Sequence, residues 1–157
     1  MRISLMRYKS PLGEISCVFE GDSLVEIAIK ERPLFAPAGC PLVENSGLKR
    51  ELDEYFAGRL KRFSQKIKFI TGTQFEHKIW HALKKIPSGQ TRTYKWIAEQ
   101  AGSPKAVRAA GQALGKNPLP IIVPCHRVIA SDGALTGYSS GGVKVKEFLL
   151  RLENQGA

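Results

Sequence analysis

Alternating hydrophobic positions dominate the first thirty residues and predict a small antiparallel sheet. Ile15, Cys17 and Phe19 fall on one side of an extended chain, because successive side chains of a strand face opposite ways. Turn-forming sequences surround Gly13 and Gly21. We therefore expect three strands in this region, with Cys17 buried in the second.

A helical period follows, and then one more alternating segment. The hydrophobic residues at the spacing of one helix face are Leu48, Leu52, Tyr55 and Phe56. They predict a helix near 43–57 that ends at Gly58. Residues 66–70 alternate again, which predicts a last strand and completes a small α+β unit.

The chain changes character at Thr71-Gly72, and we expect a domain of residues 1–70 and another of residues 71–157. Thr73 and Glu76 have the spacing of a capping box, which marks a helix start. An apolar stripe then continues at helical spacing through Phe75, Ile79, Leu83 and Ile86. This helix is expected to stop before Pro87.

Two shorter helices come next and predict a helix-turn-helix. The first covers about 93–101 and ends at Gly102. For the second we expect Ser103 as the cap, Pro104 in the first position and Leu114 near the end. An ordinary helical hairpin without DNA binding gives the same pattern, so this feature alone decides nothing.

The second of these helices is rich in alanine and glycine, and the long cation Arg108 projects from this small-residue surface. Small side chains let a helix backbone approach another surface closely, which serves helix packing and minor-groove binding alike. Proteins of the minor groove commonly insert a side chain into the base stack. Arg108 is the candidate for that insertion.

Charge adds a candidate partner. The chain has 24 Lys and Arg against 14 Asp and Glu, a net charge of +10. Residues 1–70 hold 12 basic and 9 acidic residues, whereas residues 71–157 hold 12 and 5. An excess in one part suggests a polyanion such as nucleic acid as the partner, with a merely solvated basic surface as the alternative.

The composition excludes collagen, disorder and a disulfide scaffold. No stretch predicts a signal peptide or a membrane helix, so we expect an intracellular protein.

The chemistry concentrates in the segment Asn-Pro-Leu-Pro-Ile-Ile-Val-Pro-Cys-His-Arg-Val, residues 117–128. Its three prolines stiffen the approach to Cys125. The next residue, His126, is able to take the thiol proton, and the positive charge of Arg127 favours a thiolate. A buried structural cysteine is the alternative. The two other cysteines, Cys17 and Cys40, have no zinc-binding spacing, so we expect no metal and no cofactor.

These residues resemble the O6-alkylguanine-DNA alkyltransferases, the methylated-DNA–protein-cysteine methyltransferases. The likeness extends over most of residues 71–157: GTQFEHKIWHALKKIPSGQTRTY, KAVRAAGQAL, PCHRV and YSSGGVKVKEFLL. Residues 1–70 match only the general layout of the family's variable N-terminal domain. The resemblance implies an α+β fold: a ribonuclease-H-like antiparallel sheet with a helix, then a mainly helical, winged-helix-like domain with the helix-turn-helix.

The resemblance also implies a set of catalytic residues. Cys125 would attack the alkyl carbon on the guanine O6, and O4-alkylthymines would be second substrates. His126 would deprotonate Cys125 through a water, with Glu153 orienting the histidine. Asn117 would hold the turns around the site, and Tyr94 would donate to the departing guanine. The alkyl group would stay on the cysteine, so each molecule would react once.

DNA contacts and the guanine pocket are implied in the same way. Arg108 would fill the space of a base flipped from double-stranded DNA, which would be bound through its minor groove. The further residues implied at the DNA are Thr93, Tyr94, Ala109 and Gly111. Those implied at the alkylguanine are Tyr94, Pro120, Val128 and Ser140.

Two positions depart from the family pattern. A pair, Ser139-Ser140, precedes Gly141-Gly142 where many members have one small residue, and Thr93 replaces a commoner serine. The resemblance further implies a monomer without membrane attachment, cytoplasmic and nucleoid-associated in a prokaryote or nuclear in a eukaryote.

Three other functions compete with alkyl transfer. A lesion sensor of the same fold would lack the reactive cysteine, which this chain has. A helix-turn-helix regulator would read the major groove with longer polar side chains than residues 105–114 offer. A cysteine hydrolase would catalyse many turnovers and would need an oxyanion hole. Nothing else in the sequence indicates such a hole.

Overall fold

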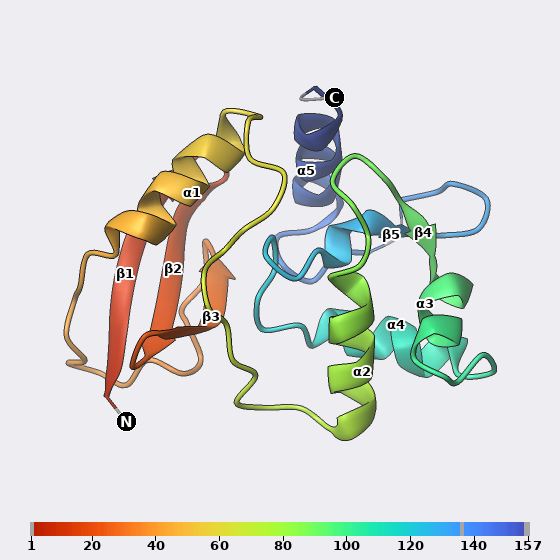
Figure 1. The fold of residues 1–157 in the computed structure, drawn as a ribbon, viewed down its shortest axis with the longest axis horizontal. Helices are drawn as coiled ribbons and strands as arrows, with labels where there is room; N and C mark the ends of the chain where they lie inside the picture. The colour runs from red at the N-terminus through yellow and green to blue at the C-terminus, as the bar shows by residue number, and fades with distance from the viewer. Residues whose placement is uncertain (1, 136, 156–157) are drawn as a thin grey trace. The chain divides into compact units, whose positions relative to one another are not determined.

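The computed structural model describes residues 2–135 and 137–155, and it divides the chain into two compact units, Met1–Ile70 and Thr71–Ala157 (Figure 1). The fold is α+β, as the sequence predicts. Within the described residues, no helix has the length and hydropathy needed to cross a membrane.

A three-stranded antiparallel sheet forms the first unit, in the order β1-β2-β3. Its strands are β1 (Ile3–Ser10), β2 (Gly13–Glu20) and β3 (Ser23–Ile29). The connecting turns are tight because Gly13 and Gly21 adopt positive φ angles of 105° and 62°. The three predicted strands are confirmed, and Cys17 is fully buried in β2. All three cysteines of the chain are free thiols.

One helix, α1 (Ser46–Phe56), packs against this sheet. Asn45 caps it by accepting a hydrogen bond from the Leu48 N–H. Tyr8 of β1 donates to the Asp53 carboxylate at 2.6 Å and stacks on Phe56. The predicted helix near 43–57 is confirmed with slightly shorter limits.

The strand predicted over 66–70 is wrong. The segment makes one isolated bridge, Leu24 to Ile67, with hydrogen bonds from the Leu24 N–H to Lys66 and from Lys68 to Leu24. Its alternation is real, since Ile67 and Phe69 are half-buried between exposed neighbours. Alternation reports an extended chain with one inward face, and it does not report whether a full hydrogen-bonded ladder forms.

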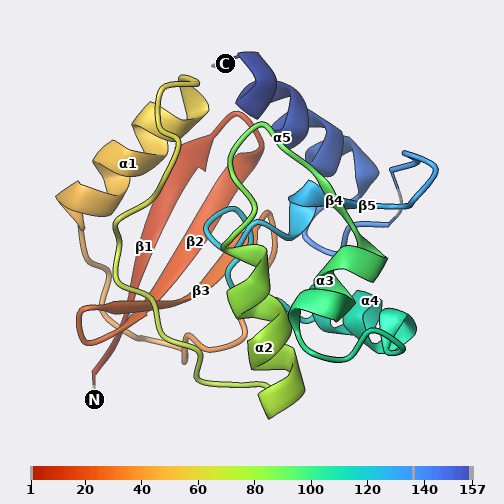
Figure 2. The ribbon, with the colours of Figure 1, turned by 45° about the vertical axis from the view of Figure 1, so that its right-hand side comes forward.

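The second unit is mainly helical. Its elements in chain order are α2 (Gln74–Leu83), β4 (Arg92–Thr93), α3 (Tyr94–Gln100), α4 (Val107–Gly115), the 3₁₀ turn η1 (Cys125–Arg127), β5 (Val128–Ile129) and α5 (Val143–Gln155). Helix α4 packs against α2 and α3, β4 pairs in parallel with β5, and α5 packs against η1 (Figure 2). The α3–α4 pair is the predicted helix-turn-helix.

Capping chemistry explains where α2 begins and what holds it to α4. Thr73 and Glu76 form the predicted capping box, with both reciprocal hydrogen bonds present. The helix ends at Leu83, before the predicted limit at Ile86. The fully buried Trp80 donates its indole N–H to the Ala113 carbonyl of α4 at 2.9 Å.

The predicted start of α4 is wrong. Ser103 does not cap the helix, which begins at Val107 without a side-chain cap. Instead the Ala106 N–H bonds to the Ser103 carbonyl at 2.9 Å, which closes a turn with Pro104 in its second position. Proline presets the φ angle of that turn position as readily as that of a first helical residue.

Candidate active site

A rigid segment carries the reactive cysteine into the second unit. The Asn117 amide donates to the Val123 carbonyl at 2.8 Å and accepts from the Leu119 N–H at 2.9 Å. Between these anchors Ile121 has a φ of 77°, a rare conformation for a β-branched residue. Such strain costs about 1–3 kcal/mol and persists only where the surroundings enforce it. Asn117 therefore connects both ends of the strained segment that precedes Cys125 through hydrogen bonds.

The Cys125 thiol lies in a mostly enclosed position at the start of η1, with the residue only 5% exposed. Burial raises the pKa of this thiol. Hydrogen bonding by the side chains of Asn117 and Tyr138 and the positive charge of Lys146 act in the opposite direction. The site thus penalises a thiolate by desolvation and partly compensates it with three polar neighbours.

Behind the cysteine lies a buried ionic cluster of His126, Arg127 and Glu153. The His126 Nε2 is 2.7 Å from Glu153 Oε2, and the histidine is completely buried. The Arg127 guanidinium donates to both oxygens of Glu153, at 2.8 and 2.9 Å, and to the Ile86 carbonyl. The three charged or polar side chains therefore fix one another.

Electrostatics assign the protonation states of this cluster. Burial raises the pKa of Glu153, but the hydrogen bonds from His126 and Arg127 outweigh it, so the net pKa is far below its usual value. Burial lowers the pKa of His126, although Glu153 opposes that change. An ionised Glu153 accepts the Nε2–H of a neutral imidazole, which leaves the lone pair on Nδ1. Among the described residues, Nδ1 of His126 has no hydrogen-bond partner.

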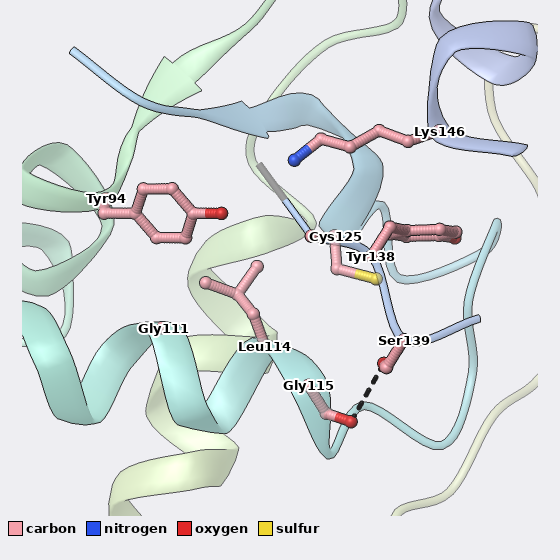
Figure 3. Close-up of a pocket in the computed structure, with 9 residues that line it drawn as sticks. Tyr94, Gly111, Leu114, Gly115, Cys125, Tyr138, Ser139 and Lys146 are labelled. Carbon is pink, nitrogen blue, oxygen red and sulfur yellow. Dashed lines mark hydrogen bonds between the residues drawn. The ribbon is translucent and has the colours of Figure 1, made fainter. Parts of the chain in front are cut away.

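In front of the cysteine opens a cavity of about 370 Å³. The residues that line it are Tyr94, Gly111, Leu114, Gly115, Cys125, Gly137, Tyr138, Ser139 and Lys146 (Figure 3). The Tyr94 hydroxyl and the Lys146 ammonium both point inward, from α3 and α5. Cavities of this size accommodate small ligands or single nucleobases.

Comparison with known proteins gives this site its family. Residues 74–155 match the family model described as 6-O-methylguanine DNA methyltransferase, DNA binding domain. A methylated-DNA–protein-cysteine methyltransferase from Methanosarcina acetivorans is 45% identical over 150 residues, covering 93% of this chain and 95% of the relative. The chain belongs to the methylated-DNA–protein-cysteine methyltransferase family. The constitutive methyltransferase of Bacillus subtilis is also similar, with 41% identity over 92% of each chain.

Solved methyltransferase structures agree with the fold over nearly the whole chain. The Mycobacterium tuberculosis OGT in complex with DNA superposes with a TM-score of 0.89 at 40% identity, covering 98% of this chain and 94% of that one. The methyltransferase of the archaeon Pyrococcus kodakaraensis gives 0.71 at 26% identity, covering 96% and 98%. The M. tuberculosis protein, which has a fold similar to that of this chain, was solved with DNA bound.

The predicted DNA-binding residues of the helix-turn-helix differ in their exposure to solvent. Arg108 and Ala109 are exposed on α4, whereas the alanines of its other face, such as Ala110, are buried against the unit. Thr93 and Gly111 are half-buried; Thr93 caps α3, and the ring of Tyr94 lies opposite the Cα of Gly111. Helix packing therefore accounts for only part of the small residues in α4.

In the part of the chain that the structure describes, only one of the residues predicted to contact the alkylguanine lines the cavity beside Cys125. Tyr94 lines the cavity beside Cys125. Pro120, Val128 and Ser140 are buried in the unit, and none of them is among the described residues that line the cavity. Within the described chain, no group of three His, Cys, Asp or Glu side chains is arranged to hold a metal ion.

Sequence reasoning missed the roles of several site residues, among them Tyr138, which hydrogen-bonds to the Cys125 thiol and lines the cavity. From the sequence we considered only the charge of Arg127, yet its guanidinium makes a bidentate hydrogen bond to the Glu153 carboxylate. Ser139 lines the cavity, and its hydroxyl donates to the Gly115 carbonyl at 3.0 Å (Figure 3). Lys146 is buried in α5, and its spacing of seven residues from Glu153 is the one signal that places both on a shared helix face.

Proposed function

We propose that this protein repairs double-stranded DNA by transferring the alkyl group of O6-alkylguanine irreversibly to its own Cys125. One observation carries the proposal: the Cys125 thiol borders a base-sized cavity while an oriented His126–Glu153 pair lies directly behind it. The family relatives, named for the same transfer, support the assignment.

The first step is the deprotonation of Cys125. The thiol has Asn117 and Tyr138 as its hydrogen-bonding side chains, so the proton reaches His126 Nδ1 through a bridging water. Glu153 stabilises the imidazolium that forms, and Arg127 keeps Glu153 ionised and in position. This is a base with an orienting acid, the arrangement that activates nucleophiles in many enzymes.

The second step is displacement at the alkyl carbon. The sulfur forms a bond to that carbon, the bond from carbon to O6 breaks, and its electron pair stays with the guanine. An inward-pointing Tyr94 hydroxyl is placed to donate a hydrogen bond to the departing base (Figure 3). That donation makes guanine a better leaving group, because it disperses the negative charge that develops.

The substrate base reaches Cys125 by leaving the helical stack. A duplex hides the O6 substituent, and flipping requires a few kcal/mol, less for a poorly paired lesion. We propose that α4 enters the minor groove, where the exposed Arg108 fills the vacated space and Thr93, Ala109 and Gly111 approach the backbone. O4-alkylthymine presents the same chemistry and is the proposed second substrate.

The remaining site residues have supporting roles in this proposal. Asn117 holds the strained turn before Cys125, and Pro120, Val128 and Ser140, which are buried but do not line the cavity, support the residues that do. The protein acts as a monomer without a cofactor. It works where the DNA is, in the cytoplasm of a prokaryote or the nucleus of a eukaryote.

Transfer of a labelled methyl group tests this function. Duplex DNA with one labelled O6-methylguanine is mixed with limiting protein, and protein-bound label is counted until it reaches a plateau. We expect one methyl per protein molecule, none with Cys125→Ser, and an unchanged plateau with Cys40→Ser. Label release with repeated turnover, or a plateau that survives Cys125→Ser, would refute the proposal.

A further inference from the structure

An unpaired buried cation borders the cavity where the alkyl group would sit. Lys146 is only 1% exposed and is among the largest fully buried side chains of the chain. Its ammonium points into the cavity between Tyr94 and Cys125 in Figure 3. Within residues 2–135 and 137–155, no carboxylate forms an ion pair with it, although seven such pairs occur elsewhere.

Such a charge is unfavourable by itself. A buried ionised group without a partner is strongly destabilised unless an anion or several hydrogen bonds compensate it. Glu153, the nearest buried acid along α5, is already held by His126 and Arg127. Burial lowers the pKa of Lys146, and negative charge on Cys125 raises it. An anion held in the cavity that both residues border would stabilise the ammonium in the same way.

We propose that Lys146 forms a subsite for anionic alkyl groups, so that this protein accepts carboxyalkyl adducts of guanine such as O6-carboxymethylguanine as favoured substrates. The inference rests on the proposed transfer to Cys125. The thiolate attacks the methylene carbon, the bond from carbon to O6 breaks with its electron pair on guanine, and the carboxylate stays unreacted beside the ammonium.

The charge arrangement gives this subsite a specific advantage. During displacement the negative charge leaves the sulfur, so a neutral alkyl group leaves Lys146 without an anion in the product. A carboxymethyl group supplies one before, during and after the transfer. Its product, S-carboxymethyl-Cys125, keeps an ion pair in a site of low polarity, where charge-assisted hydrogen bonds are strong.

Two small reagents test the subsite without DNA. Iodoacetate and iodoacetamide both alkylate a thiolate by expelling iodide, and they differ only in the charge of the group delivered. The ratio of their rates at Cys125 is measured by peptide mass and divided by the ratio at a neutral cysteine model peptide. We expect the normalised ratio to be at least tenfold in favour of iodoacetate. A value near one would overturn the proposal.

Variants then assign the effect to one residue. Lys146→Met removes the charge with similar volume and should bring the normalised ratio close to one, whereas Lys146→Arg should retain most of it. Lys144→Met removes an exposed charge two residues away on the same helix and should leave the ratio unchanged. Equal ratios in Lys146→Met and the unmodified protein would contradict the subsite, since a general effect of net charge acts at both positions.

DNA completes the test and separates it from the parent proposal. Duplexes carrying O6-carboxymethylguanine and its neutral isostere O6-carbamoylmethylguanine are compared by the rate of transfer. We expect the acid to react faster, by at least tenfold, and Lys146→Met to abolish the difference. Equal rates would refute the subsite alone, whereas no transfer from any lesion, O6-methylguanine included, would refute the proposed function.

Discussion

His126 Nε2 lies 2.7 Å from Glu153 Oε2, with both side chains buried, so one tautomer of the imidazole is fixed from behind. The opposite nitrogen, Nδ1, is thereby left with a free lone pair in the neutral imidazole. Two helical segments distant in sequence, η1 and α5, create this relationship when they pack together.

Glu153→Gln tests that relationship. The substitution keeps the shape but leaves the Arg127 guanidinium buried without its counter-charge, so we expect a loss of about 3–5 kcal/mol in the free energy of unfolding. Transfer to Cys125 should also slow by at least tenfold in the fraction that remains folded. Glu147→Gln, in an exposed pair with Arg151 on the same helix, is the matched control and should change neither. Unchanged transfer in folded Glu153→Gln would show that Glu153 does not assist the deprotonation of Cys125.

Stability should fall as the medium becomes acidic. The pKa of His126 is lowered by burial, so below its ordinary value near 6.5 the unfolded chain binds a proton that the folded chain does not. The free energy of unfolding therefore decreases as pH falls from about 7 to 5, and the lowered pKa of Glu153 extends the decrease to below 4.5. Denaturant titrations at several pH values measure this. His126→Gln should flatten the slope between pH 7 and 5, and an equally steep slope would assign it to other groups.

Arg108→Ala separates base flipping from chemistry. Because Arg108 is exposed on α4 and is not among the described residues that line the cavity at Cys125, its removal should slow repair of duplex DNA by tenfold or more. Reaction with free O6-alkylguanine base should change little. Lys105→Ala removes another exposed cation just before α4 and should weaken duplex repair only modestly. Equal losses on duplex and free base would refute the proposed insertion of Arg108.

Ser139 should influence which alkyl groups fit. Its hydroxyl ties the segment before α5 to the end of α4 at the cavity, through the Gly115 carbonyl. We expect Ser139→Ala to increase transfer of bulky groups such as benzyl relative to methyl several-fold, because the two walls separate more easily. The exposed Ser131 of the same connection provides the control, Ser131→Ala. An unchanged benzyl-to-methyl rate ratio would show that the hydrogen bond does not limit the cavity.

Local chemistry was readable from the sequence, and long-range placement was not. The capping box of Thr73 and Glu76 was predictable because its partners are three residues apart. The helix start predicted at Ser103 and Pro104 was wrong because a turn and a helix start use the same residue types. Only the surrounding packing determines which of the two forms.

The same distinction between local and long-range features applies to the active-site residues. Cys125 and His126 are adjacent in sequence, so their pairing in one segment was visible. The bidentate contact of Arg127 with Glu153 and the burial of Lys146 depend on how α5 packs against η1. No periodicity reports such an approach between segments some twenty residues apart, which is why the resemblance was needed for Glu153 and why Lys146 was missed.

The most direct test of alkyl transfer is the mass of Cys125 after contact with the lesion. The protein is incubated with duplex DNA containing O6-methylguanine and is then digested. The masses of its three cysteine-containing peptides are measured by mass spectrometry. The account predicts one methyl group on the Cys125 peptide in stoichiometric amount, with Cys17 and Cys40 unmodified and guanine restored in the DNA. Restored guanine with an unmodified Cys125 peptide, or intact lesions after prolonged incubation, would contradict it.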